Sequence, residues 1–176
     1  MIDGRYGETR YNDFHTDLQY SLDSREDKQL DYFYLTAFPH AERVEMVSYE
    51  DNPELQKKGV DKIIHFANGR RVTVDEKKRR KDYGDILLEI YSNAEQKSAG
   101  WLFYSQCDYI VYAILPAGKI YLLPVLLLQM AWKKNRYEWW EKYPQKYADN
   151  KYYHTMNIAI PTEVLLTAIR REMTKE

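Results

Sequence analysis

The chain has 176 residues, of which 44% are hydrophobic and 30% are charged, a balance typical of soluble globular domains rather than of disordered or fibrous proteins. Its net charge of -1 argues against a protein that coats nucleic acid with its whole surface. Cys107 is the only cysteine, which excludes an intrachain disulfide and multi-cysteine metal sites and favours a reducing, cytoplasmic compartment.

The beginning of the chain carries few signals of regular structure. Residues 1–23 are polar and rich in tyrosine, so we expect an irregular N-terminal arm followed by a single domain over residues 24–176. Residues 1–8 lack the basic start and apolar run of a signal peptide. Ser24 is a suitable N-cap, and apolar residues at helical spacing after it predict a helix that ends near Pro39.

The next segment contains a predicted hairpin. Residues 60–66 and 71–77 are short apolar runs on either side of Asn68-Gly69, a pair that tolerates positive φ, so we expect them to be antiparallel neighbours. Before the hairpin, residues 42–49 alternate imperfectly and only weakly predict a strand. Residues 54–58 predict one helical turn closed by a glycine.

The second half of the chain alternates between strand and helix patterns. The expected elements are a strand over residues 86–91, a hairpin of residues 109–115 and 119–123, a helix from Pro124 through Trp132, a strand over residues 157–160 and a helix capped by Thr162. Proline, glycine and polar residues interrupt the most apolar stretch, residues 109–132, so a membrane span is not expected. This order predicts an α/β fold with a central mixed β-sheet flanked by helices.

Three charged residues of the predicted hairpin have the arrangement of a metal-dependent hydrolytic site. Asp75 and Lys77 are two positions apart on one strand, so they project from the same face. The start of the first strand lies beside the end of the second, which brings Asp61 toward Asp75. Two carboxylates beside an ammonium group suit Mg²⁺, or Mn²⁺, together with a substrate phosphate, while the lysine orients a water or stabilises charge at phosphorus.

A second acid-x-lysine triplet, residues 76–78, overlaps the first but points to the other face of the strand. Val72 and Val74 share that other face, so we expect it to turn toward the core. Asp75 and Lys77 are then left to line the cleft.

At this point the chain resembles a known family. Gly59-Val60-Asp61, a hairpin and then Val72-Thr73-Val74-Asp75-Glu76-Lys77 look like the PD-(D/E)XK nuclease superfamily. The stretch from Gln56 to Ser92 is similar to small phage or prophage proteins of that superfamily, and the resemblance covers about residues 24–125. It implies a restriction-endonuclease-like fold and metal-dependent cleavage of DNA. Val60 stands where the named pattern has proline, a variation that the superfamily tolerates.

The resemblance also assigns roles to single positions. It implies that Asp61 and Asp75 bind the metal, that Lys77 assists hydrolysis, and that Glu89 supplies a further metal-binding acid from the next strand. Gln56 matches a helix position where other members have Glu or Gln near the metal.

Charge is concentrated around these acids. Residues 57–81 hold ten basic and three acidic residues, a balance of +7, and the rest of the chain is therefore -8. Such a block predicts a local anion-binding surface, and a solvated turn is the other interpretation. The candidate nucleic-acid contacts are Gln56, Lys78, Arg79, Arg80 and Lys81.

Other residue classes give weaker signals. The four histidines lack metal-ligand spacing, and Cys107, in an apolar stretch, is expected to be a buried structural thiol. Several aromatic residues could stack on bases, although core packing or a partner interface is the default expectation for them. They are Trp101, Phe103, Tyr104, Trp132, Tyr137, Trp139 and Trp140.

Together these features predict a Mg²⁺-dependent DNA endonuclease that hydrolyses phosphodiester bonds. One alternative is a non-catalytic nucleic-acid-binding or phage assembly protein that retains the nuclease fold. Another is a structural protein in which Asp61, Asp75 and Lys77 form only surface ion pairs. DNA is the expected partner, no membrane partner is expected, and a homodimer would suit two-strand cleavage.

Overall fold

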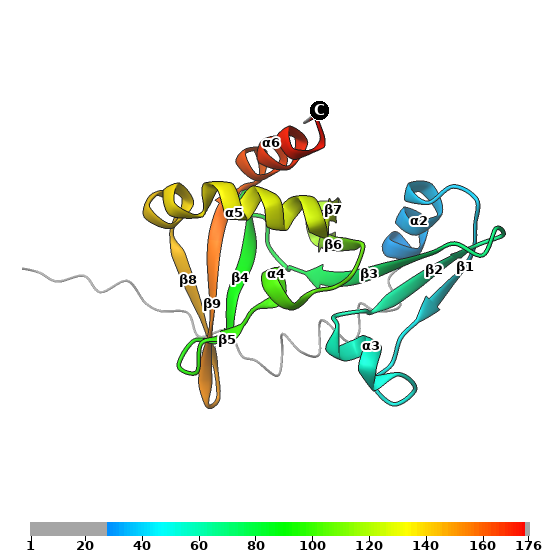
Figure 1. Ribbon diagram of the computed structural model, residues 1–176, viewed down its shortest axis with the longest axis horizontal. Coiled ribbons are helices and arrows are strands. Elements are labelled where there is room, and N and C mark those ends of the chain that lie inside the picture. The colour runs from blue at the N-terminus through cyan, green and yellow to red at the C-terminus, as the bar shows by residue number, and fades with distance from the viewer. Residues whose placement is uncertain (1–27, 175–176) are drawn as a thin grey trace, which may run out of the picture.

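The computed structural model describes residues 28–174, which form two β-sheets with helices packed against them (Figure 1). The five-stranded sheet has the order β1-β2-β3-β6-β7, and the four-stranded sheet has the order β5-β4-β9-β8. In the larger sheet β3 and β6 are parallel and the other neighbours are antiparallel, so the expected mixed sheet flanked by helices is confirmed. The predicted arm, residues 1–23, and the predicted cap Ser24 lie outside the described residues.

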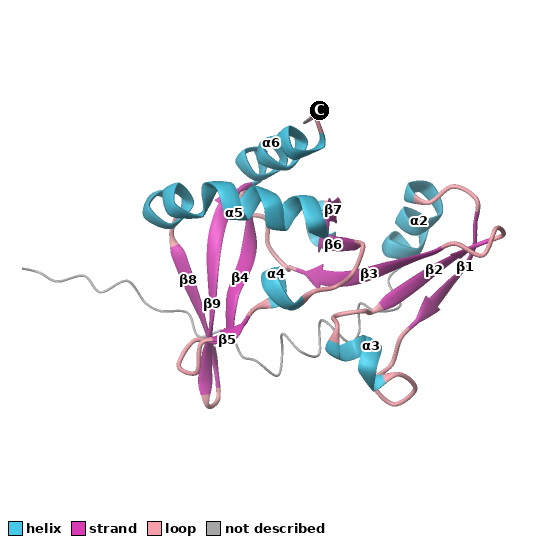
Figure 2. Ribbon diagram, in the orientation of Figure 1, coloured by secondary structure: helices cyan, strands magenta, loops and turns pink. Residues whose placement is uncertain are grey.

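Figure 2 distinguishes the helices from the strands by colour. The strands are β1 (Ala41–Met46), β2 (Lys62–Phe66), β3 (Arg71–Lys78), β4 (Asp85–Asn93), β5 (Ser98–Ala99), β6 (Tyr109–Ile114), β7 (Lys119–Pro124), β8 (Gln145–Asn150) and β9 (Tyr153–Pro161). The helices are α2 (Lys28–Ala37), α3 (Pro53–Lys57), α4 (Trp101–Tyr104), α5 (Val125–Lys142) and α6 (Thr162–Met173), with a 3₁₀ turn over Leu115–Ala117.

The β2–β3 hairpin forms as predicted. Gly69 has a φ of +80°, a conformation that glycine adopts without steric cost, and it turns the chain between the two strands. Ile64 lies opposite Val72, and Lys62 lies opposite Val74. This register fixes which residues of β3 face the candidate site and which face α2.

Two hydrophobic clusters lie on opposite faces of the larger sheet. The smaller one joins α2 to residues such as Val72 and Val74 of β3. The larger one joins the other face to the four-stranded sheet and to α5 and α6. β6 contributes to both clusters, because successive residues of a strand point to opposite faces. Ile110 and Ile114 belong to the larger cluster, and Val111 belongs to the smaller one.

The four-stranded sheet was only partly expected from the sequence. Residues of β4 and β9 pair directly, for example Leu88 with Ile158, and α5 crosses this sheet with α6 beyond it (Figure 1). β8 was not predicted, because its residues are exposed or partly exposed and carry no alternating apolar pattern. α5 extends to Lys142, ten residues beyond the predicted limit at Trp132, since Trp139 buries a further turn against the core.

Candidate active site

Asp61 directly precedes the first residue of β2, at the point where β3 extends beyond its pairing with β2. β2 pairs with β3 as far as Lys62 opposite Val74, and β6 covers the other edge of β3 through Lys78. The Asp61 N–H donates to the Val74 carbonyl at 2.8 Å, and its carboxylate Oδ2 accepts the N–H of Glu76 at 2.8 Å. The side chain of Asp61 therefore takes the place of a strand partner at the edge of β3.

Asp75 is the buried acid of this site. Its residue is 1% exposed, and its Oδ1 lies 2.6 Å from the Lys77 Nζ. Beyond that ion pair, neither oxygen accepts a hydrogen bond from the described residues. Burial raises the pKa of Asp75 to about 7; the Lys77 charge opposes the rise, and the nearby Asp61 charge adds to it. The predicted approach of Asp61 to Asp75 is thus confirmed, and a solvated surface pair is excluded for Asp75.

Lys77 is held in its charged form by this acid. Burial alone would lower the pKa of Lys77, but Asp75, with smaller contributions from Tyr104 and Asp61, outweighs burial, so the pKa is raised. The side chain keeps 26% of its surface exposed. A positive charge that is anchored at one end and reachable from solvent can orient a water or an anion.

The opposite face of β3 carries a separate ionic cluster. Glu76 accepts the Tyr34 hydroxyl at 2.7 Å and pairs with Lys62 at 3.0 Å and with Lys78 at 3.2 Å. The side chain of Lys62 is 4% exposed, that of Lys78 is 3% and that of Glu76 is 5%. Burial would raise the pKa of Glu76, but the Lys62 charge, the Tyr34 hydroxyl and the Lys78 charge together outweigh it, so the pKa is lowered. The predicted division of faces is therefore confirmed, since the side chains of Glu76 and Lys78 are buried on the face opposite to Asp75, where Glu76 contacts Tyr34 of α2.

Glu89 comes from β4, in the other sheet, and approaches the site from the side of Lys77. Burial raises the pKa of Glu89, and the N–H of Trp101 and the Lys77 charge oppose the rise. Its Oε1 accepts that N–H at 3.0 Å, which ties the start of α4 to β4. A Cβ on Gly100 would lie far inside van der Waals contact with the Glu89 backbone, so this close approach requires a glycine.

Tyr104, on α4, lies at the site, whereas the sequence had named it only as one of several aromatic residues that could stack on bases. Burial raises its pKa, the Lys77 charge opposes the rise, and the charges of Asp75, Glu89 and Asp61 add to it. The Tyr104 hydroxyl therefore lies within electrostatic reach of all four predicted site residues. Tyr104 is fifteen or more residues away from each acid of the site, and nothing in the sequence indicated that it would lie near them.

Two carboxylates, rather than three, form the candidate cation site. Within residues 28–174 no group of three or more His, Cys, Asp or Glu side chains is placed to hold a metal ion. Glu89 as a third ligand therefore stays a prediction. A magnesium ion is commonly held by one or two carboxylates together with waters and substrate phosphate, so Asp61 and the unsatisfied Asp75 fit its requirements. The adjoining pocket is lined by Met46, Val47, Asp61, Lys62, Glu76, Lys77 and Lys78.

The segment before β2 closes the back of the site. Gly59 has a φ of +81°, and a Cβ there would lie 3.0 Å from the Asp75 Oδ2. The Cys107 thiol donates to the Gly59 carbonyl at 3.2 Å, and burial raises the pKa of Cys107 to about 12, as expected of a structural thiol. Gln56 donates to the Val47 carbonyl at 2.6 Å, so its amide holds the chain ahead of the site.

The basic block is not uniformly available to a ligand. Lys78 is buried against Glu76, so the structure does not offer its amino group to a surface phosphate. Arg79 pairs with Asp85 and lies 4.8 Å from the centre of the Tyr83 ring.

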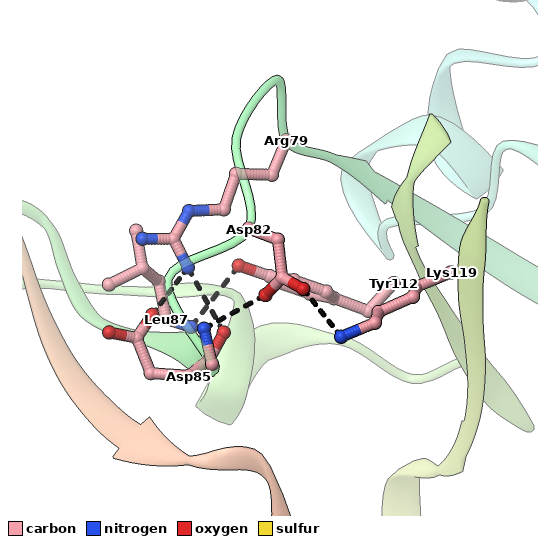
Figure 3. A network of polar contacts seen from close by, with 7 residues as sticks. Arg79, Asp82, Asp85, Leu87, Tyr112 and Lys119 are labelled. Atoms are coloured by element: carbon pink, nitrogen blue, oxygen red, sulfur yellow. Dashed lines mark hydrogen bonds and ion pairs between the residues drawn. The ribbon is translucent and has the colours of Figure 1, made fainter. Parts of the chain in front are cut away.

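Arg79 belongs to the network that fixes the connection from β3 to β4 (Figure 3). In the same network Lys119 pairs with Asp82 at 2.5 Å, and the Leu87 N–H donates to the Tyr112 hydroxyl at 3.2 Å. Of the four basic candidates, Arg80 and Lys81 are exposed, and they remain predicted contacts.

Comparisons with protein families, with curated proteins and with solved structures found no match for this chain.

Proposed function

We propose that the chain is a metal-dependent DNA endonuclease of the PD-(D/E)XK type, with a restriction-endonuclease-like fold. The proposal rests on one observation above all. Asp75 is buried beside Asp61, its Oδ1 pairs with Lys77, and its Oδ2 accepts no hydrogen bond from the described residues. A buried carboxylate in this condition is unfavourable unless a cation or a proton completes its surroundings.

The residues of the site have distinct roles in this proposal. Asp61 is oriented by the Glu76 N–H, and Asp75 is oriented by Lys77, so both carboxylates are fixed before any ligand arrives. They would hold Mg²⁺ or Mn²⁺, which when bound supplies charge neutralisation at the phosphate and lowers the pKa of a coordinated water. Lys77 positions the attacking water and stabilises negative charge at the phosphoryl oxygens.

Two residues on the far side of the site support this arrangement. Glu89 lies within electrostatic reach of Lys77 and fixes the start of α4 through the Trp101 N–H. Tyr104 faces the same four charges and can donate its hydroxyl proton to a phosphate oxygen, because its raised pKa keeps it protonated at neutral pH.

DNA is the substrate proposed because the site lies within the +7 block of residues 57–81. Exposed Arg80 and Lys81 follow directly on β3 and supply charge near the pocket. Neutralisation of backbone phosphates is the main sequence-independent contribution to DNA affinity, so a local basic surface is sufficient despite the net charge of -1.

Cleavage of supercoiled plasmid tests the proposal. Wild-type protein is incubated with plasmid in Mg²⁺, in Mn²⁺ and in EDTA, and nicked and linear products are measured on a gel. Lys77→Ala is the inactive variant, and Glu163→Gln, an exposed acid at the start of α6, is the matched control. We expect nicking in either metal by the wild type and by the control, and none by Lys77→Ala.

The same experiment separates the alternatives. Protein that binds DNA but leaves plasmid, branched and single-stranded substrates intact in both metals would be a non-catalytic nucleic-acid-binding or assembly protein. Equal nicking by the wild type and Lys77→Ala would place the activity elsewhere or in a contaminant.

A further inference from the structure

An aromatic groove lies beside the candidate active site, between α4 and α5. Two adjoining pockets share Phe103, Trp132 and Arg136. We call this surface the α4–α5 groove; its residues are Ile90, Tyr91, Phe103, Gln129, Trp132, Lys133, Arg136, Tyr137 and Trp140.

Three of the groove's rings are available to a ligand. Phe103 is 46% exposed, Trp140 is 39% and Tyr137 is 73%. Trp132, which is buried, supports Phe103 edge-to-face with the ring centres 6.3 Å apart. Phe103 is therefore held by a ring of the core and presents an exposed surface with little need to be ordered on binding, which lowers the entropic cost of binding.

The charge of the groove is positive. Lys133 and Arg136 are its charged residues among those described, and no carboxylate lines either pocket. The Arg136 guanidinium lies 4.8 Å from the centre of the Tyr137 ring and donates to the Tyr137 hydroxyl at 3.0 Å. Exposed rings interleaved with cations suit an anionic polymer that carries flat, aromatic groups.

Helix α4 contributes a residue both to the groove and to the site. Phe103 lines the groove, and the next residue, Tyr104, lies within electrostatic reach of the charged site residues. The Gln129 side chain donates to the Leu102 carbonyl at 3.1 Å, which fixes α5 against α4. A strand whose phosphate reached Lys77 would therefore have neighbouring nucleotides close to Phe103.

We infer that the α4–α5 groove binds unpaired bases of a DNA strand, so that the substrate is single-stranded DNA or DNA with an unpaired segment at the cleavage point. This inference rests on the proposed function and narrows it. The faces of bases inside a duplex are covered by their neighbours, whereas unpaired bases can stack on Phe103, Tyr137 or Trp140. Arg136 and Lys133 contact the phosphates between them.

Fluorescence anisotropy in EDTA, which prevents cleavage, measures this preference. The probes are a short labelled single strand and a duplex of the same sequence and length. The full-length protein is compared with the double variant Phe103→Ala, Trp140→Ala, with the conservative variant Phe103→Tyr, and with Tyr152→Ala as a control at an 82% exposed tyrosine outside the groove.

We expect the wild type to bind the single strand more tightly than the duplex. The double variant should lose about 10- to 100-fold in affinity for the single strand, as loss of stacking predicts. Its affinity for the duplex should stay within about 2-fold, and Phe103→Tyr and Tyr152→Ala should behave as wild type. Quenching of tryptophan fluorescence by the single strand should be reduced in Trp140→Ala.

Three results would overturn the inference. The double variant could bind the single strand as tightly as the wild type, the wild type could show no preference for the single strand, or the double variant could change the oligomeric state without changing DNA affinity. The last result would assign the groove to a second copy of the chain. Plasmid nicking by the wild type but not by Lys77→Ala would leave the nuclease proposal intact in each case, so the two failures are distinguishable.

Discussion

The Asp61 carboxylate accepts the backbone N–H of Glu76 at 2.8 Å, just beyond the last pair of the β2–β3 ladder, Lys62 with Val74. This bond directs the carboxylate toward β3 instead of toward solvent. It also brings the Asp61 charge close enough to Asp75 to raise the pKa of Asp75. The hairpin thereby places two acids together beside Lys77, and burial of Asp75 is the main reason that its pKa stays raised.

Divalent-cation binding should depend on Asp75. Asp75→Asn removes the charge of the buried carboxylate but keeps its size, so we expect calorimetry to detect binding of Mg²⁺ or Mn²⁺ to the wild type and none to the variant. Glu89→Gln tests the predicted third ligand: a clear loss of affinity would make Glu89 a ligand, and unchanged affinity would limit the site to Asp61 and Asp75. Equal affinity of the wild type and Asp75→Asn would remove Asp75 from the cation site.

The pKa of Asp75 makes a prediction about stability. The group titrates at about 7 in the folded protein and near 3.8 when unperturbed, so between these pH values the folded state binds more protons than the unfolded state. Stability therefore falls as pH rises through this window. Asp75→Asn removes the fall, and without metal it should raise Tm at pH 8 by about 3–6 °C, with little change at pH 4.

Thermal unfolding in EDTA at the two pH values checks this sign. Addition of Mg²⁺ at pH 8 should then raise the Tm of the wild type but not that of Asp75→Asn, because a ligand that binds only the folded state stabilises it. A variant less stable than the wild type at pH 8 would show that the Lys77 ion pair outweighs the cost of burying Asp75.

Lys77 and Lys78 are adjacent but should give different phenotypes. Lys77→Ala should reduce the cleavage rate by about 100- to 1,000-fold with the fold intact, since it removes the cation of the site. It should also lower Tm at pH 8, because it leaves the ionised, buried Asp75 without its ion pair. Lys78→Ala should keep activity but cost about 1–3 kcal/mol in stability, because it leaves Glu76 with Lys62 as its remaining basic partner. Activity lost with Lys78 and kept without Lys77 would move the site to the other face of β3.

DNA affinity should depend on salt through a local surface. Replacing Arg80 and Lys81 with Glu should weaken binding and reduce the slope of log affinity against log salt by about 2, because each of the two side chains neutralises one phosphate. Replacing Arg170 and Arg171 on α6 with Glu makes the same change of charge at a distance from the pocket, and affinity should stay within about 2-fold. Similar decreases in affinity for the two double variants would show that net charge, and not the basic block, governs binding.

Much of the larger sheet could be predicted because its signals are local. Asn68-Gly69 determines the turn of the β2–β3 hairpin, and alternation of Val72 and Val74 with polar residues determines which face is buried. The proximity of the Asp61 and Asp75 side chains could be predicted from those two facts. Each step used residues within one hairpin.

The remainder depends on contacts between distant segments. Pairing of β4 with β9 joins residues about 70 positions apart, such as Leu88 and Ile158, and nothing in either strand specifies the other. The placement of Tyr104 depends on how α4 packs against β4 through Gly100. Burial of Lys78 against Glu76 likewise carried no local signal, because residues 77–81 have the composition of an exposed basic run.

The four residues Asp75, Glu76, Lys77 and Lys78 read acid, acid, lysine, lysine, so their charge pattern is almost unchanged by a shift of one position. If β3 slipped by one residue, Glu76 and Lys78 would stand where Asp75 and Lys77 now stand, and electrostatics would hardly distinguish the two alignments. Val72 and Val74 break this degeneracy, because the slip would expel both from the core beneath α2. The charged residues that form the candidate site therefore do not determine the register of β3. Two apolar side chains that take no part in the chemistry, Val72 and Val74, determine it.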